Sequence, residues 1–179
     1  MQFVPEERLG RGAVPGLSLA ENLLLTRAGP GLPGRGGWID RRRLATMAVG
    51  VIERFEVKAG GPDALARSLS GGNLQKFIVG REIDAAPRVL LLAQPTWGVD
   101  VGAAARIRAE ILSLRDAGCA VLVVSEELDE LLEIADRLHV IARGRLSPSV
   151  VAQQASVESI GEWMSGLWSR DAIAPDAGE

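Results

Sequence analysis

The hydrophobic pattern of the second half of the chain alternates between continuous apolar runs and helix-spaced apolar positions. RVLLLAQ (88–94) and CAVLVVSEE (119–127) are uniformly apolar runs, which predicts strands buried on both faces of a sheet. Between them, AAARIRAEILSLRDAG (103–118) is amphipathic and ends at a glycine, as a helix does. Strands that alternate with helices in this way predict a parallel sheet in an α/β fold.

The segments that follow predict smaller elements. LDELLEIADRL (128–138) reads as a helix, and RLHVIARGRL (137–146) alternates around a turn at Gly144, which favours a hairpin. From about Ser147 the chain is expected to be a tail whose end, APDAGE, is frayed.

The first half of the chain predicts a mainly helical insert over about residues 15–80. Phe3 and Val4 look like the end of a strand. SLAENLLLT (18–26) begins with Ser18 followed three residues later by Glu21, the spacing of a capping box. Further predicted elements are a Gly/Pro loop (29–37), a helix (40–55) and a helix that runs from the glycine pair to about Asp84.

Composition narrows the classes of function. The chain has 179 residues and a formal net charge of −3, which argues against a nucleic-acid partner held by bulk charge. No apolar run reaches the roughly 18 residues of a membrane helix, so we expect a soluble, cytoplasmic chain. Cys119 is the single cysteine and His139 the single histidine. Both are predicted to be structural, and no metal site is expected.

One short motif carries candidate chemistry. In LSGGNLQK (69–76), Ser70, Gly71 and Gly72 precede a predicted helix. The N–H groups of a helix N-terminus can hold a phosphate, and glycines let the backbone approach it closely. Taken alone, the motif fits a plain turn better than a phosphate site.

The surrounding segments change that interpretation, because the chain resembles the ATP-binding-cassette (ABC) ATPases. LSGGNLQK resembles their signature motif, RVLLLAQPTWGVD (88–100) their Walker B strand with D-loop, and LVVSEELDELLEIADRLHVIARGRL (122–146) their switch region. FVPEERLGRGAVPGLSLAENLLL (3–25) resembles the Q-loop segment in the second cassette of importers that carry two cassettes in one polypeptide.

The resemblance implies an α/β, P-loop NTPase-like fold that lacks its N-terminal P-loop portion. A partial ABC ATPase domain is expected over 1–146, in which about 15–80 form a helical subdomain with the signature motif near its end. Residues 85–146 are expected to form the Walker B, D-loop and switch part of the core, and 147–179 a C-terminal tail.

Several positions depart from the family pattern. The P-loop, G-x-x-x-x-G-K-[ST], is absent from the sequence, and neither Lys58 nor Lys76, the only lysines, follows a glycine. We therefore expect that Met1 corresponds to the start of the Q-loop segment. Ala93 stands where the family has the Asp that helps to hold Mg²⁺, and Gln94 where it has the Glu that polarises the attacking water.

Further departures lie at the Q-loop, the switch and the D-loop. Glu126 aligns with the switch histidine and Glu6 with the Q-loop glutamine, and a carboxylate at either place would repel the γ-phosphate. Trp97 stands in the D-loop where Arg is usual, and a large exposed aromatic side chain suggests a partner surface. The D-loop Asp100 is retained. No catalytic residue is therefore expected to be intact.

The combination implies a degenerate second cassette of an importer for nucleosides or simple sugars. Ser70, Gly71, Gly72 and Asn73 would contact ATP in trans, with Asp100 in the D-loop; the ATP and its Mg²⁺ would be bound mainly by a partner cassette. The partners implied are that cassette and membrane-spanning permease subunits, and no nucleic acid. The location implied is the inner face of the cell membrane, through the permease.

Other interpretations remain open at this stage. The chain is alternatively a truncated, inactive remnant of such a protein, in which the sheet would have an unpaired edge. A DNA-repair or chromosome-organising ATPase shares an LSGG motif, but long coiled-coil insertions and basic surfaces are not found here. A competent standalone ATPase is disfavoured because the groups that hold and activate the nucleotide are replaced. The transported solute cannot be read from the sequence.

Overall fold

The computed structural model describes residues 1–27 and 38–168, and the chain divides into two compact units, Met1–Glu126 and Glu127–Glu179. The loop predicted over 29–37 and the APDAGE end lie outside the described residues. Within the described part, no helix has the length and apolar character needed to cross a bilayer.

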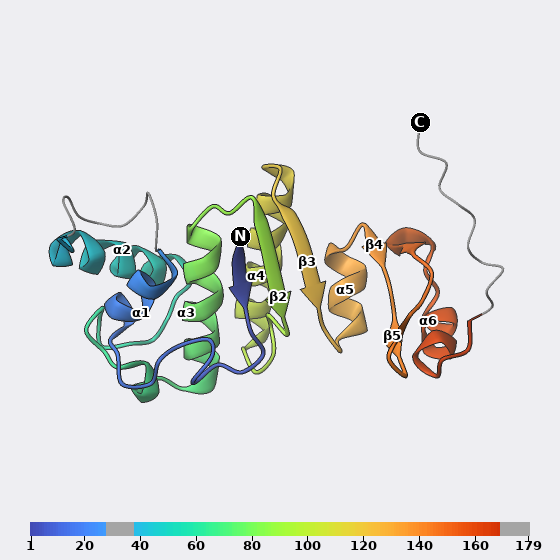
Figure 1. The fold of residues 1–179 in the computed structure, drawn as a ribbon, viewed down its shortest axis with the longest axis horizontal. Helices are drawn as coiled ribbons and strands as arrows, with labels where there is room; N and C mark the ends of the chain where they lie inside the picture. Colours follow the sequence, from blue (N-terminus) through green and yellow to red (C-terminus); the bar gives the residue numbers. More distant parts are fainter. Residues whose placement is uncertain (28–37, 169–179) are drawn as a thin grey trace. The chain divides into compact units, whose positions relative to one another are not determined.

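The first unit is built on a three-stranded parallel sheet (Figure 1). Its strands are β1 (Gln2–Val4), β2 (Val89–Ala93) and β3 (Ala120–Val124), in the order β1-β2-β3. Helix α4 (Val101–Asp116) makes the crossover from β2 to β3. The parallel sheet and the α/β class are therefore confirmed, and α4 begins two residues before the predicted start because Asp100 caps it.

One face of this sheet forms the core of the unit. Val4 pairs with Leu92 in register, and Leu90 lies two residues before Leu92, so the three side chains share a face. All three are at most 1% exposed. Helices α3 (Gly71–Asp84) and α4 cover this face, as shown by their contacts with β1 and β3 (Figure 1).

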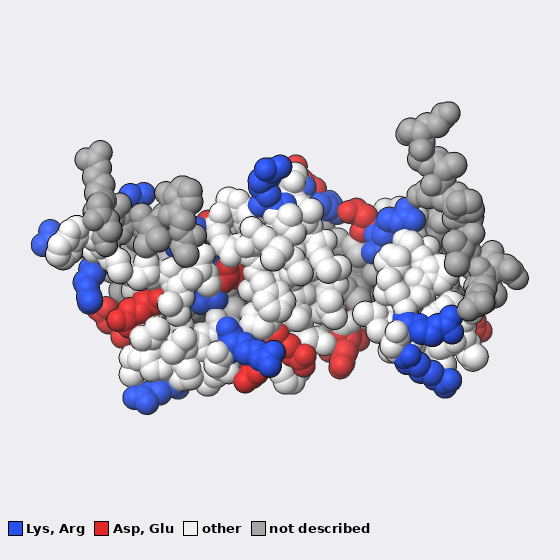
Figure 2. Space-filling view, viewed as in Figure 1, with Lys and Arg blue, Asp and Glu red and all other residues white. Residues whose placement is uncertain are grey.

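The opposite face of the sheet is apolar but open. Phe3, Leu122 and Val124 are 53%, 57% and 52% exposed. Figure 2 shows an expanse without charged side chains over β2 and β3 on this face. The prediction that both apolar runs are buried on both faces is therefore wrong for this structure, because α3 and α4 lie on one side of the sheet only.

The helical part of the first unit confirms the local predictions. It contains α1 (Leu19–Thr26), α2 (Arg41–Arg54) and the 3₁₀ turn η1 (Ala66–Ser68), followed by α3. At α1, the Ser18 hydroxyl accepts from the Glu21 N–H at 3.1 Å and the Glu21 carboxylate accepts from the Ser18 N–H at 2.9 Å. This is the predicted capping box, and its hydrogen bonds hold the pKa of Glu21 below its usual value.

The second unit consists of short elements. They are α5 (Leu128–Ile134), β4 (Arg137–Leu138), β5 (Ile141–Ala142), β6 (Arg145–Leu146), β7 (Val150–Val151), η2 (Ala152–Gln154) and α6 (Val157–Met164). Strands β5 and β6 form the predicted hairpin around Gly144, but β4 pairs antiparallel with β7 instead of joining it. Helix α5 therefore ends four residues earlier than predicted.

Hydrogen bonds explain the break in the hairpin. The Val140 N–H donates to the Ser147 hydroxyl at 2.8 Å, and the Ser147 N–H donates back to the Val140 carbonyl at 2.8 Å. His139 Nδ1 lies 3.1 Å from the Ser147 carbonyl, in keeping with a structural histidine. Residues 147–168, expected to belong to a tail, include β7 and α6.

Candidate functional site

The signature residues form the N-terminus of α3. Ser70 is the N-cap, and its hydroxyl accepts from the backbone N–H of Asn73 at 3.4 Å and from the Asn73 side-chain amide at 2.9 Å. The Asn73 side-chain oxygen accepts from the Lys58 N–H at 2.8 Å. Ser70 and Gly71 are exposed, so the first turn of α3 presents backbone N–H groups and the partial positive charge of a helix N-terminus to solvent.

Gly72 lies directly against the D-loop. A Cβ placed on Gly72 would lie 2.8 Å from the carbonyl oxygen of Gly98, which is closer than a side chain tolerates against backbone. Gly98 itself has φ +66°, a left-handed conformation that glycine adopts without strain. Glycine at position 72 is thus required by packing inside this chain, in addition to any role in binding a phosphate.

The D-loop aspartate is used as a helix cap. Asp100 accepts from the Ala103 N–H at 2.9 Å at the start of α4, and this hydrogen bond holds the pKa of the Asp100 carboxyl below its usual value. The side chain is exposed, so its carboxylate remains accessible from solvent.

Arg8, which sequence reasoning missed, joins the loop after β1 to both of these segments. Its Nε donates to the side-chain oxygen of Gln75 at 3.1 Å, and its Nη2 donates to the Trp97 carbonyl. The guanidinium carbon lies 5.0 Å from the centroid of the Trp97 ring, a cation–π distance. The guanidinium is half-buried, and its partial loss of hydration lowers the pKa of Arg8. Trp97 remains 58% exposed beside Arg8, in line with the prediction of a large exposed aromatic side chain at this position.

The carboxyl ends of β2 and β3 meet at Gln94 and Glu126, the residues predicted to stand at the Walker B and switch positions. Gln94 has φ +52°, and its N–H donates to the Val124 carbonyl at 2.8 Å. Its side-chain oxygen accepts from the Glu126 N–H at 3.3 Å. The structure therefore brings Gln94 and Glu126 together, and the neutral amide spans the two strand ends.

Glu6 and Ala93 lie around one hollow at the same edge, with Trp97 also in its lining. At the position where the resemblance predicts a carboxylate for Mg²⁺ the chain has Ala93, and the next residue is the neutral Gln94. No group of three potential metal ligands occurs within residues 1–27 and 38–168. Ala93 thus presents a methyl group and Gln94 a neutral amide at this edge, while Glu6 and Glu7 line the hollow beside them.

The lysine that ends the signature motif makes its hydrogen bond away from the N-terminus of α3. Lys76 is buried, and its Nζ donates to the Glu56 carbonyl at 2.8 Å. It thus helps to fix the segment after α2 against α3 and does not point to a phosphate at the N-terminus of the helix.

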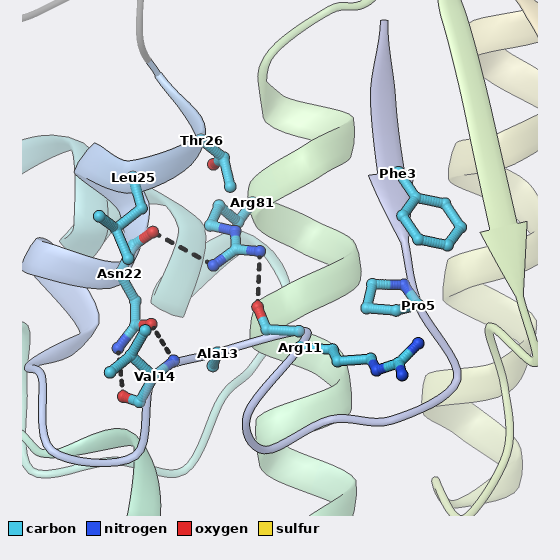
Figure 3. A pocket seen from close by; sticks show the side chains of 10 residues that line it. Phe3, Pro5, Arg11, Ala13, Val14, Asn22, Leu25, Thr26 and Arg81 are labelled. Atoms are coloured by element: carbon cyan, nitrogen blue, oxygen red, sulfur yellow. Dashed lines mark hydrogen bonds between the residues drawn. The ribbon is translucent and has the colours of Figure 1, made fainter.

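A second hollow beside the segment after β1 is lined by side chains that hydrogen-bond to one another and to the backbone (Figure 3). Arg81 donates to the Asn22 carbonyl at 3.1 Å and to the Gly12 carbonyl at 2.8 Å, and Asn22 is bonded to both backbone groups of Val14. Arg81 also pairs with Glu82 at 2.7 Å, and both side chains are nearly fully buried. Burial lowers the pKa of Arg81 and raises the pKa of Glu82. This network is structural.

No family model matches the chain. The chain is 39% identical over 163 residues to the nucleoside import ATP-binding protein NupA of Lactococcus lactis subsp. cremoris, covering 91% of this chain and 32% of NupA. It is 37% identical over 169 residues to the guanosine import ATP-binding protein NupO of Bacillus subtilis, covering 94% and 33%.

A third relative is the ribose import ATP-binding protein RbsA 1 of Rubrobacter xylanophilus, 39% identical over 158 residues, with 88% of this chain and 32% of that protein covered. The chain thus spans about a third of the length of the curated relatives it matches.

Solved structures agree on the fold. The ATP-binding cassette MJ0796, in a dimeric post-hydrolysis state bound to ADP and Pi, superposes with a TM-score of 0.69 at 21% identity, covering 84% of this chain and 62% of that one. The ATP-binding subunit of an ABC transporter gives a TM-score of 0.67 at 16% identity, and the match covers 91% of this chain and 67% of that subunit. The chain is a homologue of the ATP-binding proteins of nucleoside and sugar ABC importers, and its α/β fold is that of part of an ABC cassette.

Proposed function

We propose that this chain supplies its signature motif to an ATP molecule held by a partner cassette and holds no nucleotide itself. Ser70, Gly71, Gly72 and Asn73 form the contact to that ATP. The observation that carries the proposal is the contrast between two sites of one unit. The signature turn is exposed and has its N-cap in place, whereas the Walker B edge offers Ala93 and Gln94 in place of carboxylates.

The chemistry of the turn fits a terminal phosphate. The first N–H groups of α3 have no partner within the helix, and the Ser70 hydroxyl lies beside them. A phosphate approaching this turn would meet the positive end of the helix dipole at close backbone distance. At the other edge, a neutral amide at position 94 cannot take a proton from water, which removes a contribution of about 10²–10⁴ in rate.

Because the relatives are ATP-binding proteins of importers, the proposed role of this chain is in solute import. The proposed partners are a second cassette and membrane-spanning permease subunits of an importer for nucleosides or simple sugars. ATP with Mg²⁺ would be held mainly by the second cassette, and the assembly would lie at the cytoplasmic face of the membrane.

The test mixes the chain with an intact, P-loop-containing cassette of a homologous importer and measures ATP turnover. The wild-type chain is expected to raise turnover, and Ser70→Arg, which fills the turn, is expected to remove the increase. Ser68→Arg is the matched control, because Ser68 is exposed two residues away in η1 and is not part of the signature motif. If neither the wild type nor Ser70→Arg changes turnover, complementation in trans is wrong.

A second candidate is that the chain is an inactive part of a longer cassette. The open apolar face of β1 and β3, with Phe3, Leu122 and Val124 exposed, favours it. An in-frame P-loop in the DNA upstream of Met1 would support this candidate, and its absence would favour a protein that acts as given.

A further inference from the structure

The guanidinium of Arg8 lies where three segments distant in sequence come together. These are the loop after β1, the signature turn at the start of α3, and the D-loop between β2 and α4. Arg8 reaches Gln75 across 67 residues and Trp97 across 89 residues. Few side chains can bond both partners at once, because the donors must point in different directions from one rigid plane.

The glycines of the site leave room for this guanidinium. A Cβ placed on Gly71 would lie 2.7 Å from Nη1 of Arg8, and one placed on Gly98 would lie 2.9 Å from Nη2. One glycine belongs to the signature turn and the other to the D-loop. Arg8 is thus packed between the two segments as well as hydrogen-bonded to them.

Gln75 extends the contact to the end of β2. Its side-chain oxygen accepts from Arg8, while its nitrogen donates to the Gln94 carbonyl at 3.1 Å and to the Pro95 carbonyl at 3.0 Å. Gln75 is 1% exposed, so these hydrogen bonds are sheltered from water. Loss of Arg8 would leave a buried amide oxygen without its donor.

We propose that Arg8 is a positioning residue that fixes the signature turn relative to the D-loop. It bonds Gln75 of α3 and Trp97 of the D-loop, and Gly72 lies against Gly98 between the same two segments. The inference rests on the proposed function for its role in ATP turnover, but the positioning itself is a property of this chain alone. Lysine cannot replace Arg8, since an ammonium lacks the planar fork that reaches both partners.

The experiment measures amide hydrogen exchange on the full chain by NMR. In Arg8→Lys, exchange of Leu74, Trp97 and Val99 is expected to accelerate about tenfold, because a charge-assisted hydrogen bond to each segment is lost. Arg11→Lys is the matched control, because Arg11 lies in the same loop and pairs with Glu7 on the surface. It is expected to leave these amides unchanged.

Gly71→Ala is a second variant that keeps Arg8 and lies at an exposed position. Its new methyl group would push the guanidinium away, so exchange at Trp97 and Val99 should accelerate although Gly71 is in α3. When Gly71→Ala is combined with Arg8→Lys, it should cause no further acceleration of exchange at Trp97 and Val99. Exchange unaltered in Arg8→Lys, or accelerated equally throughout α1 and α2, would overturn the positioning role.

Turnover of the intact cassette separates this inference from the proposed function. If the wild-type chain stimulates turnover, Arg8→Lys should lower the stimulation about tenfold while Arg11→Lys retains it, and equal stimulation by both would contradict the role of Arg8 in turnover. If the wild-type chain stimulates nothing while the exchange pattern appears as expected, the proposed function fails and Arg8 still positions the two segments.

Discussion

Gly72→Ala separates the packing role of the signature glycine from its proposed role in binding phosphate. In the first turn of a helix, alanine is ordinarily favoured over glycine by up to about 1 kcal/mol. Here the new methyl carbon would lie 2.8 Å from the Gly98 carbonyl oxygen. Relieving an overpacked contact of this kind costs about 1–3 kcal/mol, so the variant is expected to be less stable than the wild type.

Gly50→Ala provides the matched control. Gly50 lies within α2 with nothing within 4 Å of an added Cβ, so the substitution is expected to stabilise the unit by about 1 kcal/mol. Both variants gain the helix propensity of alanine, so they should differ by the cost of the contact, about 1–3 kcal/mol, which is about 0.5–1.5 M in urea midpoint for a slope near 2 kcal/mol per M.

Cys119 provides a reporter for the first unit. It is the sole cysteine in the sequence and is buried, so its labelling by a thiol reagent along a urea titration follows the opening of that unit. Burial also raises the pKa of the Cys119 thiol, which slows labelling in the folded state. If Gly72→Ala proves as stable as Gly50→Ala, the contact with Gly98 does not constrain the glycine.

Three further substitutions test the structure around the site. Ser18→Ala should lower stability by about 1 kcal/mol in the same urea titration, since it removes an N-cap. The pKa of Glu21 is lowered in the folded state, so the ionised carboxylate stabilises the fold. The stability difference between wild type and Glu21→Gln should therefore be present at neutral pH and shrink as the pH falls through that lowered pKa. A difference independent of pH would contradict this expectation. Arg81→Met should cost about 3–5 kcal/mol, because it breaks the buried pair with Glu82 and leaves the Asn22 and Gly12 carbonyls without their donor. A loss of stability below about 1 kcal/mol, measured by Cys119 labelling along a urea titration, would count against the buried pair.

The features that sequence predicted correctly are those whose causes are local. The capping box joins Ser18 and Glu21 three residues apart, and the signature turn begins its helix at Ser70 as the motif indicates. The parallel pairing of β2 with β3 follows from two apolar runs separated by one amphipathic helix.

The features that sequence missed depend on partners far along the chain. Nothing in PEERLG marks Arg8 as a contact of Gln75 and Trp97, because the meeting of the three segments is decided by the whole fold. The exposure of Leu122 was missed for a related reason. An apolar run indicates that both faces of a strand are suited to burial. It does not determine whether helices cover one face of the sheet or both, which depends on the rest of the fold.

If the signature turn acts on a nucleotide bound elsewhere, the chain must change the affinity of an intact homologous cassette for MgATP. Ser70→Asp is the informative variant: aspartate caps a helix about as well as serine, but its carboxylate repels a phosphate. Ser70→Asn keeps a neutral cap and serves as the control. We expect the wild-type chain to bind no MgATP alone and to tighten MgATP binding by the cassette, and we expect Ser70→Asp to abolish this tightening. MgATP binding by the isolated chain, or equal tightening by wild type and Ser70→Asp, would contradict the proposed function.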